Sequence, residues 1–209
     1  MSDYFARRET MVDTQVRPSD VTKFPIIEAM LTVPREQFVP IVRREAAYMG
    51  ENIDLGGGRV LIEARTLAKL LDALDIQPDE SVLDIGCAYG YSTAVIARMA
   101  GSVVGVEEDA AMAAAATQAL GAKVVTGPLA AGAAGPFDVV IIEGGVEEIP
   151  AAIADQIKDG GRIAAVFMQG ALGTARIGFK AEGRITWRFA FNATAPVLPG
   201  FAKARVFAL

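Results

Sequence analysis

The sequence contains no histidine and a single cysteine, Cys87. Without imidazole side chains there is no Ser-His-Asp triad, no histidine general base and no histidine metal ligand. One thiol can neither close an internal disulfide nor build a multi-cysteine metal site. We therefore expect no metal centre, so any catalysis has to use carboxylates, hydroxyls, amides or a bound cofactor.

Long apolar runs and an excess of positive charge are also absent. Hydrophobic residues make up 52% of the chain, but no unbroken run reaches the length of a membrane span. The first residues are polar and lack the apolar segment of a secretory signal. With 20 basic against 25 acidic residues and a net charge of −5, the chain has no broad positive surface for nucleic acid. These patterns predict a soluble, cytoplasmic protein with neither a membrane nor a nucleic-acid partner, and they leave its oligomeric state open.

Short apolar segments alternate with helical patterns from residue 81 to residue 168. Segments rich in valine and isoleucine are typical of a parallel sheet that helices cover on both faces. The sequence therefore predicts an α/β fold with a Rossmann-like, doubly wound sheet, whose strands are expected at residues 81–85, 102–107, 123–126, 137–142 and 161–168. The intervening helices are expected at residues 91–99, 109–120 and 149–158.

Two regions depart from this alternation. Strand patterns without intervening helices predict an antiparallel edge of the mostly parallel sheet, at residues 175–181, 185–192 and 205–209. The beginning of the chain has helical patterns broken by proline and glycine, at residues 3–16, 21–31, 36–48 and 61–74. We expect an N-terminal helical extension, residues 1–78, packed on an α/β core, residues 79–209, as a single structural unit.

The segment from Val82 to Tyr91 predicts a ligand site, because it passes from a strand through a glycine turn into a helix. Ligands of doubly wound sheets bind at the carboxyl ends of the strands. Gly86 and Gly90 allow a close approach to the backbone, and Glu107 follows 21 residues after Gly86, where a carboxylate can accept hydrogen bonds from ribose hydroxyls.

The same residues also allow purely structural interpretations. The turn is also compatible with a plain strand-to-helix connection, and Glu107 with a solvated residue at a strand end. A dinucleotide site would need glycine at residues 86, 88 and 91, but the chain has Ala88 and Tyr91 at two of these positions. A nicotinamide-dependent oxidoreductase is therefore disfavoured.

Several motifs along the chain are similar to those of one enzyme family. They are Val-Pro-Arg-Glu-Gln-Phe-Val-Pro at residues 33–40, Leu-Asp-Ile-Gly at residues 83–86, Gly-Tyr-Ser-Thr-Ala at residues 90–94 and Val-Gly-Val-Glu at residues 104–107. With Pro-Phe-Asp-Val-Val at residues 136–140 and Gly-Gly-Arg at residues 160–162, the chain resembles the protein-L-isoaspartate O-methyltransferases. The resemblance implies a class I methyltransferase fold and S-adenosylmethionine as cofactor.

The resemblance also implies roles for residues of the glycine turn. Asp84, Gly86 and Gly90 would line the methionine side of the cofactor, with Cys87 and Ala88 in the turn between them. Glu107 would bind the ribose. The methyl acceptor would be a carboxylate on a protein, a peptide or a small molecule.

The segment that contacts substrate in this family departs from its pattern here. When Gly56 and Gly58 are placed on the family's glycine pair, Arg59 replaces a glutamine, Val60 a threonine, Ile62 a serine and Ala64 a proline. Pro128 stands at the position of an acid that would contact adenine. We therefore expect cofactor binding to persist and isoaspartyl methylation to be weak or absent.

Other charged residues are candidates beside this segment. Glu143 follows the fourth strand, where its carboxylate can meet the cofactor's amino group or a substrate, or lie in a polar loop. Arg59 and Glu63 are candidate catalytic residues, and Arg59 or Arg65 can pair with an anionic substrate. Exposed helix charges are the simpler interpretation of these residues.

Two functions from different classes follow. The first is a methyltransferase that acts on a carboxylate, which needs alignment rather than a base because the sulfonium is already activated. The second is a homologue that keeps the cofactor fold as a scaffold or sensor without isoaspartyl activity.

Overall fold

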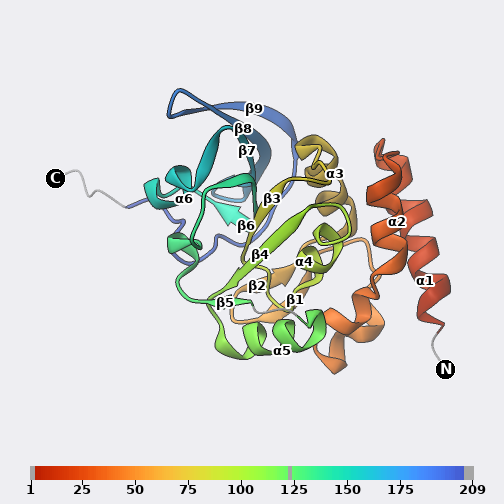
Figure 1. Cartoon of the computed structure of the whole chain (residues 1–209). Helices are drawn as coiled ribbons and strands as arrows, with labels where there is room; N and C mark the ends of the chain where they lie inside the picture. Colours follow the sequence, from red (N-terminus) through yellow and green to blue (C-terminus); the bar gives the residue numbers. More distant parts are fainter. Residues whose placement is uncertain (1–2, 122–123, 205–209) are drawn as a thin grey trace.

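The computed structural model describes residues 3–121 and 124–204, which contain a seven-stranded sheet in the order β5-β4-β3-β6-β7-β8-β9 (Figure 1). The first five strands in this order are parallel, and β8 and β9 pair antiparallel. The strands are β3 (Ser81–Ile85), β4 (Ser102–Glu107), β5 (Val125–Thr126), β6 (Phe137–Val146), β7 (Ile157–Gln169), β8 (Leu172–Ala181) and β9 (Arg184–Asn192). The predicted α/β class, with a mostly parallel sheet and an antiparallel edge, is confirmed.

Side chains of the central strands alternate between two buried cores. In β3, Val82 packs on one face of the sheet, and Leu83 and Ile85 pack on the other. This alternation is that of a strand buried on both faces. The face of Val82 is covered by α3 (Ala64–Leu74), α4 (Tyr91–Ile96) and the N-terminal helices, and the opposite face by α6 (Ala151–Asp155). Helix α5 (Ala110–Leu120) packs beside the turn after β3.

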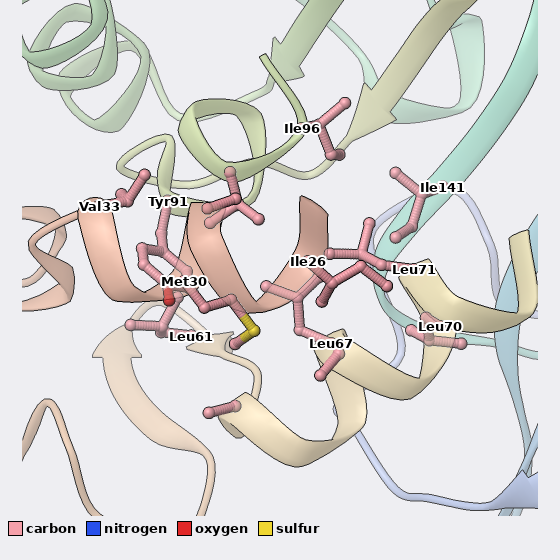
Figure 2. Close-up of a cluster of buried hydrophobic side chains, with 14 of the residues drawn as sticks. Ile26, Met30, Val33, Leu61, Leu67, Leu70, Leu71, Tyr91, Ile96 and Ile141 are labelled. Atoms are coloured by element: carbon pink, nitrogen blue, oxygen red, sulfur yellow. The ribbon is translucent and has the colours of Figure 1, made fainter. Parts of the chain in front are cut away.

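The N-terminal segment shares the first of these cores. It comprises α1 (Tyr4–Met11), which continues into a π-helical turn at Val12–Val16, and α2 (Phe24–Thr32). Figure 2 shows Ile26 and Met30 of α2 beside Leu67 and Leu71 of α3, in one cluster of buried side chains. The segment is therefore held to the sheet by apolar contacts, which stabilise in proportion to the apolar area that they remove from water.

Two predicted helices of this region need correction. The helix expected at residues 36–48 is wrong, because Pro40 separates two short 3-10 segments, Arg35–Phe38 and Ile41–Ala46. The helix expected at residues 61–74 begins only at Ala64. The residues just before it form a hairpin, in which β2 (Arg59–Leu61) pairs antiparallel with β1 (Ile53–Gly56).

Other boundaries also differ from the prediction. The helix expected at residues 149–158 is restricted to α6, because Ile157 already pairs with Phe137 of β6. The strand expected at residues 123–126 is described only as Val125–Thr126. The strand expected at residues 205–209 lies outside the described residues. Among the described helices, none combines the length and the apolar character needed to cross a membrane.

Candidate functional site

The turn between β3 and α4 is the centre of the site. Gly86, Ala88 and Gly90 have positive φ values of 79°, 49° and 92°, a conformation that glycine adopts at little cost. The amides of Gly86 and Cys87 donate to the carbonyl of Val106, at 2.8 and 3.3 Å, so the turn is tied to the end of β4. This contact fixes the predicted cofactor turn beside the next parallel strand.

Gly90 is placed differently from the other residues of the turn. A Cβ atom at Gly90 would lie 3.1 Å from both Ala116 Cβ and Leu120 Cδ1. The side of Gly90 on which a Cβ atom would lie therefore faces α5. Close packing between the turn and this helix is reason enough for glycine at residue 90.

Asp84 is fully buried at the carboxyl end of β3. Its Oδ2 accepts hydrogen bonds from Ser92 Oγ at 2.7 Å and Thr93 Oγ1 at 2.6 Å. Its Oδ1 has no hydrogen-bond partner among the described residues. Burial raises the pKa of Asp84 to about 6, because the charged carboxylate has lost its hydration.

Glu107 is fully buried at the end of β4, next to Asp84's strand. Its Oε2 accepts from the amide of Ala88 at 2.7 Å, and its Oε1 accepts from the amides of Glu108 and Asp109 at 2.8 and 3.0 Å. The carboxylate that was predicted to bind ribose therefore joins the glycine turn to the loop that leads into α5.

Arg59 reaches this carboxylate from β2. Its Nη1 donates to Glu107 Oε1 at 2.6 Å, and its Nη2 donates to the carbonyl of Gly86 at 2.7 Å. The side chain is 6% exposed, so the ion pair is shielded from water. Arg59 was predicted to be a catalytic candidate or to pair with an anionic substrate, but its partner in the structure is the predicted ribose ligand.

Leu198 is the second residue, besides Arg59, whose side chain lies against Gly86. It belongs to the segment that follows β9, and a Cβ atom at Gly86 would lie 3.1 Å from Leu198 Cδ1 and 2.9 Å from Arg59 Nη2. The amide of Leu198 donates to the carbonyl of Gly145 at 2.9 Å, and the amide of Gly145 donates to the carbonyl of Pro196 at 2.8 Å. These bonds hold the segment across the end of β6.

Glu143 lies in β6 with its side chain buried. Its Oε1 has no hydrogen-bond partner within the part of the chain that the structure describes. Burial raises the pKa of Glu143 well above its usual range; the negative charge of Asp84 adds to this shift, while Arg35 and Arg59 oppose it. The predicted site residues Asp84, Glu107 and Glu143 thus share one buried electrostatic environment.

Arg35 is a member of this environment that sequence reasoning did not single out. Its Nε donates to the carbonyl of Ala47 at 2.7 Å, its Nη2 donates to the carbonyl of Ile62 at 2.6 Å, and its guanidinium lies over the ring of Tyr91. Arg35 belongs to the motif at residues 33–40, but nothing in that motif indicates that the side chain is fully buried.

The remaining predicted residues lie elsewhere or have other surroundings. Cys87 is buried and burial raises the pKa of its thiol, so it is not a reactive thiolate. Ile62 is also buried. Glu63 and Arg65 form a salt bridge of 3.1 Å and line a separate cavity of about 710 Å³ together with Asn52. The structure therefore does not bring Glu63 together with Arg59.

Comparisons with known proteins agree on one family. The family model described as Protein-L-isoaspartate(D-aspartate) O-methyltransferase matches residues 6–172. The protein-L-isoaspartate O-methyltransferase of Methylorubrum extorquens (strain PA1) is 33% identical over 163 residues, which cover 75% of this chain and 72% of the relative. Protein-L-isoaspartate O-methyltransferase 2 of Marinobacter nauticus (strain ATCC 700491 / DSM 11845 / VT8) is 35% identical over 164 residues, 75% of each chain.

Solved structures show the same likeness in fold. One protein-L-isoaspartate O-methyltransferase aligns with a TM-score of 0.80 at 22% identity, over 92% of this chain and 66% of that chain. A putative protein-L-isoaspartate O-methyltransferase from Plasmodium falciparum, in complex with S-adenosyl-L-homocysteine, aligns with a TM-score of 0.79 at 16% identity, over 95% of this chain and 99% of that chain.

Proposed function

Because this chain belongs to the protein-L-isoaspartate(D-aspartate) O-methyltransferase family, we propose that it transfers the methyl group of S-adenosylmethionine to a carboxylate of a protein, a peptide or a small molecule. The predicted family is confirmed by the match over residues 6–172 and by relatives of that name. The predicted enzyme class, an S-adenosylmethionine-dependent methyltransferase, and the cofactor are confirmed with it. The methyl acceptor is the part of this function that the proposal adds.

The buried carboxylates of Asp84 and Glu143 suit the positively charged ammonium group of the cofactor. Asp84 and Glu143 each hold a buried carboxylate oxygen that has no donor among the described residues, and neighbouring anions in a desolvated site favour a cationic ligand. The ammonium group of S-adenosylmethionine offers three N–H donors and a positive charge. We propose that Asp84 and Glu143 bind this group and that Glu107 faces the ribose. The two unpartnered carboxylate oxygens are the observation that carries the proposal.

The chain's own contribution to the reaction is alignment and exclusion of water. Bound S-adenosylmethionine supplies a methyl group that its sulfonium has already activated, and a carboxylate acceptor is already nucleophilic. No general base is required, which agrees with a site that has no histidine. The buried apolar side chain of Leu198, which lies against Gly86, keeps water away from the glycine turn. Holding the acceptor in this dry site lowers the entropic part of the barrier.

Isoaspartyl peptide is proposed to be a poor acceptor. Val60 lies in β2 and Ile62 directly follows that strand, at the positions where the family has hydroxyl side chains. Each donor or acceptor that loses its partner costs roughly 1–3 kcal/mol. Two such losses lower turnover by a factor of about 10 to 10⁴. Restoring the hydroxyls with Ile62→Ser and Val60→Thr is expected to raise the rate on this peptide.

The test is transfer of a labelled methyl group from S-adenosylmethionine, with isoaspartyl peptide and with a mixture of carboxylate-bearing proteins as acceptors. Methyl esters release methanol in mild base, so volatile label after base treatment identifies a carboxylate product. We expect base-labile label on the protein mixture, less of it on isoaspartyl peptide, and none from the Asp84→Asn variant. Cofactor binding without any methyl ester would favour the alternative, a homologue that acts as a scaffold or sensor.

A further inference from the structure

The guanidinium of Arg59 is bound to Glu107, the carboxylate that the proposed function assigns to the cofactor's ribose. Arg59 donates to Glu107 Oε1 and to the carbonyl of Gly86, and both contacts are buried. The space beside Gly86 is also filled, because a Cβ atom there would come within 2.9 Å of Arg59 Nη2. The Arg59 side chain thus fills the space next to Gly86, where a ligand would come close to the backbone.

A count of hydrogen bonds shows that ribose and Arg59 compete. An ionised carboxylate has about four acceptor positions on its two oxygens. Glu107 already accepts from three backbone amides, those of Ala88, Glu108 and Asp109, in addition to Arg59 Nη1. All four positions are therefore taken, so Glu107 can accept from a ribose hydroxyl only when an existing donor leaves. The amides are fixed in the backbone of the turn and of the loop into α5, which makes Arg59 the donor that can leave.

The element that carries Arg59 is suited to such a movement. Strands β1 and β2 form a two-stranded sheet of their own, separate from the seven-stranded sheet. Residues 56–58, which directly precede Arg59, are three glycines with positive φ, and a Cβ atom at any of them would meet no atom within 4 Å. Arg59 Nε has no hydrogen-bond partner among the residues described. Release of Arg59 therefore breaks its hydrogen bonds to Glu107 and to the carbonyl of Gly86, and it leaves the main sheet intact.

We propose that Arg59 is a latch on the cofactor crevice, which has to release Glu107 before S-adenosylmethionine or S-adenosylhomocysteine can bind. The proposal rests on the proposed function, because it assumes that Glu107 faces the ribose. The apparent dissociation constant of a ligand equals its intrinsic value divided by the fraction of molecules in the competent state. A latch that is closed in most molecules thus weakens cofactor binding, and a variant without the latch binds more tightly.

Calorimetric titration of S-adenosylhomocysteine into the unmodified chain and into Arg59→Gln tests this proposal. Arg59→Gln removes the charged donor, while three backbone amides still bind the Glu107 carboxylate. We expect the variant to bind about 10- to 100-fold more tightly than the unmodified chain. Arg162→Gln is the matched control, since Arg162 also forms a salt bridge of 2.6 Å, with Glu80, away from the turn. It should bind the ligand as the unmodified chain does.

A second variant covers the case in which Arg59→Gln fails to fold, as judged by circular dichroism. Arg59→Lys keeps the charge beside Glu107 but lacks the planar fork that donates to two acceptors at once. It is expected to bind about 3- to 10-fold more tightly than the unmodified chain. Equal or weaker binding by the folded variants than by the unmodified chain would overturn the latch alone. If neither the unmodified chain nor any folded variant binds the ligand, the proposed function fails and the latch fails with it.

Discussion

Glu143 is an ionisable side chain that is buried, and this burial lowers the free energy of unfolding. Burial raises the pKa of Glu143 well above its ordinary value of 4.5, so the folded chain holds a proton that the unfolded chain releases. A group of this kind favours the folded state at low pH, and this contribution is lost as the pH rises from the ordinary value through the raised one. Above the ordinary value the group therefore opposes folding, because the folded chain has either to take up a proton or to keep a charge buried.

The Glu143→Gln variant is predicted to be more stable than the unmodified chain at pH 8, by about 1–3 kcal/mol, because it removes a buried group that at this pH has either to take up a proton or to keep its charge. The same variant is predicted to bind S-adenosylmethionine more weakly, since the ammonium group loses an anionic partner. Urea unfolding at pH 5 and pH 8, together with calorimetric titration, measures both effects. Glu148→Gln, at an exposed position of the segment after β6, should change neither. Loss of stability at pH 8 in Glu143→Gln would contradict this account of the site.

At the scale of elements, Asp138 joins three strands of the sheet. It lies in β6, accepts hydrogen bonds from the amide and the hydroxyl of Ser81 in β3, at 2.8 and 2.7 Å, and pairs with Lys158 of β7 at 2.8 Å. Lys158 and Ser81 lower the pKa of Asp138 to about 2. A depressed carboxyl pKa stabilises the fold above the unfolded value near 3.9, and this stability is lost as the pH falls through about 2.

Asp138→Asn is predicted to lower the free energy of unfolding at pH 7 by about 1–2 kcal/mol, at the low end for charged hydrogen bonds because the Lys158 side chain is partly exposed. The difference should shrink between pH 4 and pH 2, where the carboxyl of the unmodified chain takes up a proton. Urea unfolding at pH 7 and pH 3 measures it, with Asp79→Asn at an exposed position as the control. A difference of the same size at both pH values would mean that Asp138 acts through its shape rather than its charge.

For some elements the sequence predicted the first and the last residue correctly. Strands β3 and β4 were expected at the bounds that the structure has, because buried runs of valine and isoleucine between turn residues give a strong pattern. The hairpin of β1 and β2 was missed, since the three residues of β2 are too few to show a period and the glycines before them indicate only a break. The start of β7 was missed because Asp159, Gly160 and Gly161 are typical of a turn, although they lie within a strand here.

The site was predictable only in part, for a related reason. Asp84 and Glu107 end neighbouring parallel strands, so the order of elements along the chain places them together. Arg59 and Glu107 are 48 residues apart and lie in different sheets. No periodicity relates them, and only the tertiary structure shows that the Arg59 side chain turns inward. The sequence therefore named the acids and Arg59 as candidates, but it did not predict that Arg59 pairs with Glu107.

At the scale of the whole molecule, the N-terminal segment and the sheet each supply part of the site. The acids Asp84, Glu107 and Glu143 come from the sheet, whereas the bases Arg35 and Arg59 come from the segment before α3. If all five are charged, the cluster carries one more negative than positive charge, which matches a cofactor with a net positive charge. We propose that residues 1–78 are an extension that completes the cofactor site of residues 79–209.

The most direct test of this account asks whether Glu107 binds the cofactor once Arg59 is out of the way. Calorimetric titration of S-adenosylhomocysteine into Arg59→Gln and into the double variant Arg59→Gln/Glu107→Gln compares the two with the latch absent from both. The account predicts that the double variant binds more weakly by about 1–3 kcal/mol, because ribose hydroxyls lose a charged acceptor, and that NAD gives no binding heat with either. Equal affinity of the two variants for S-adenosylhomocysteine would contradict the placement of the cofactor at the ends of β3 and β4.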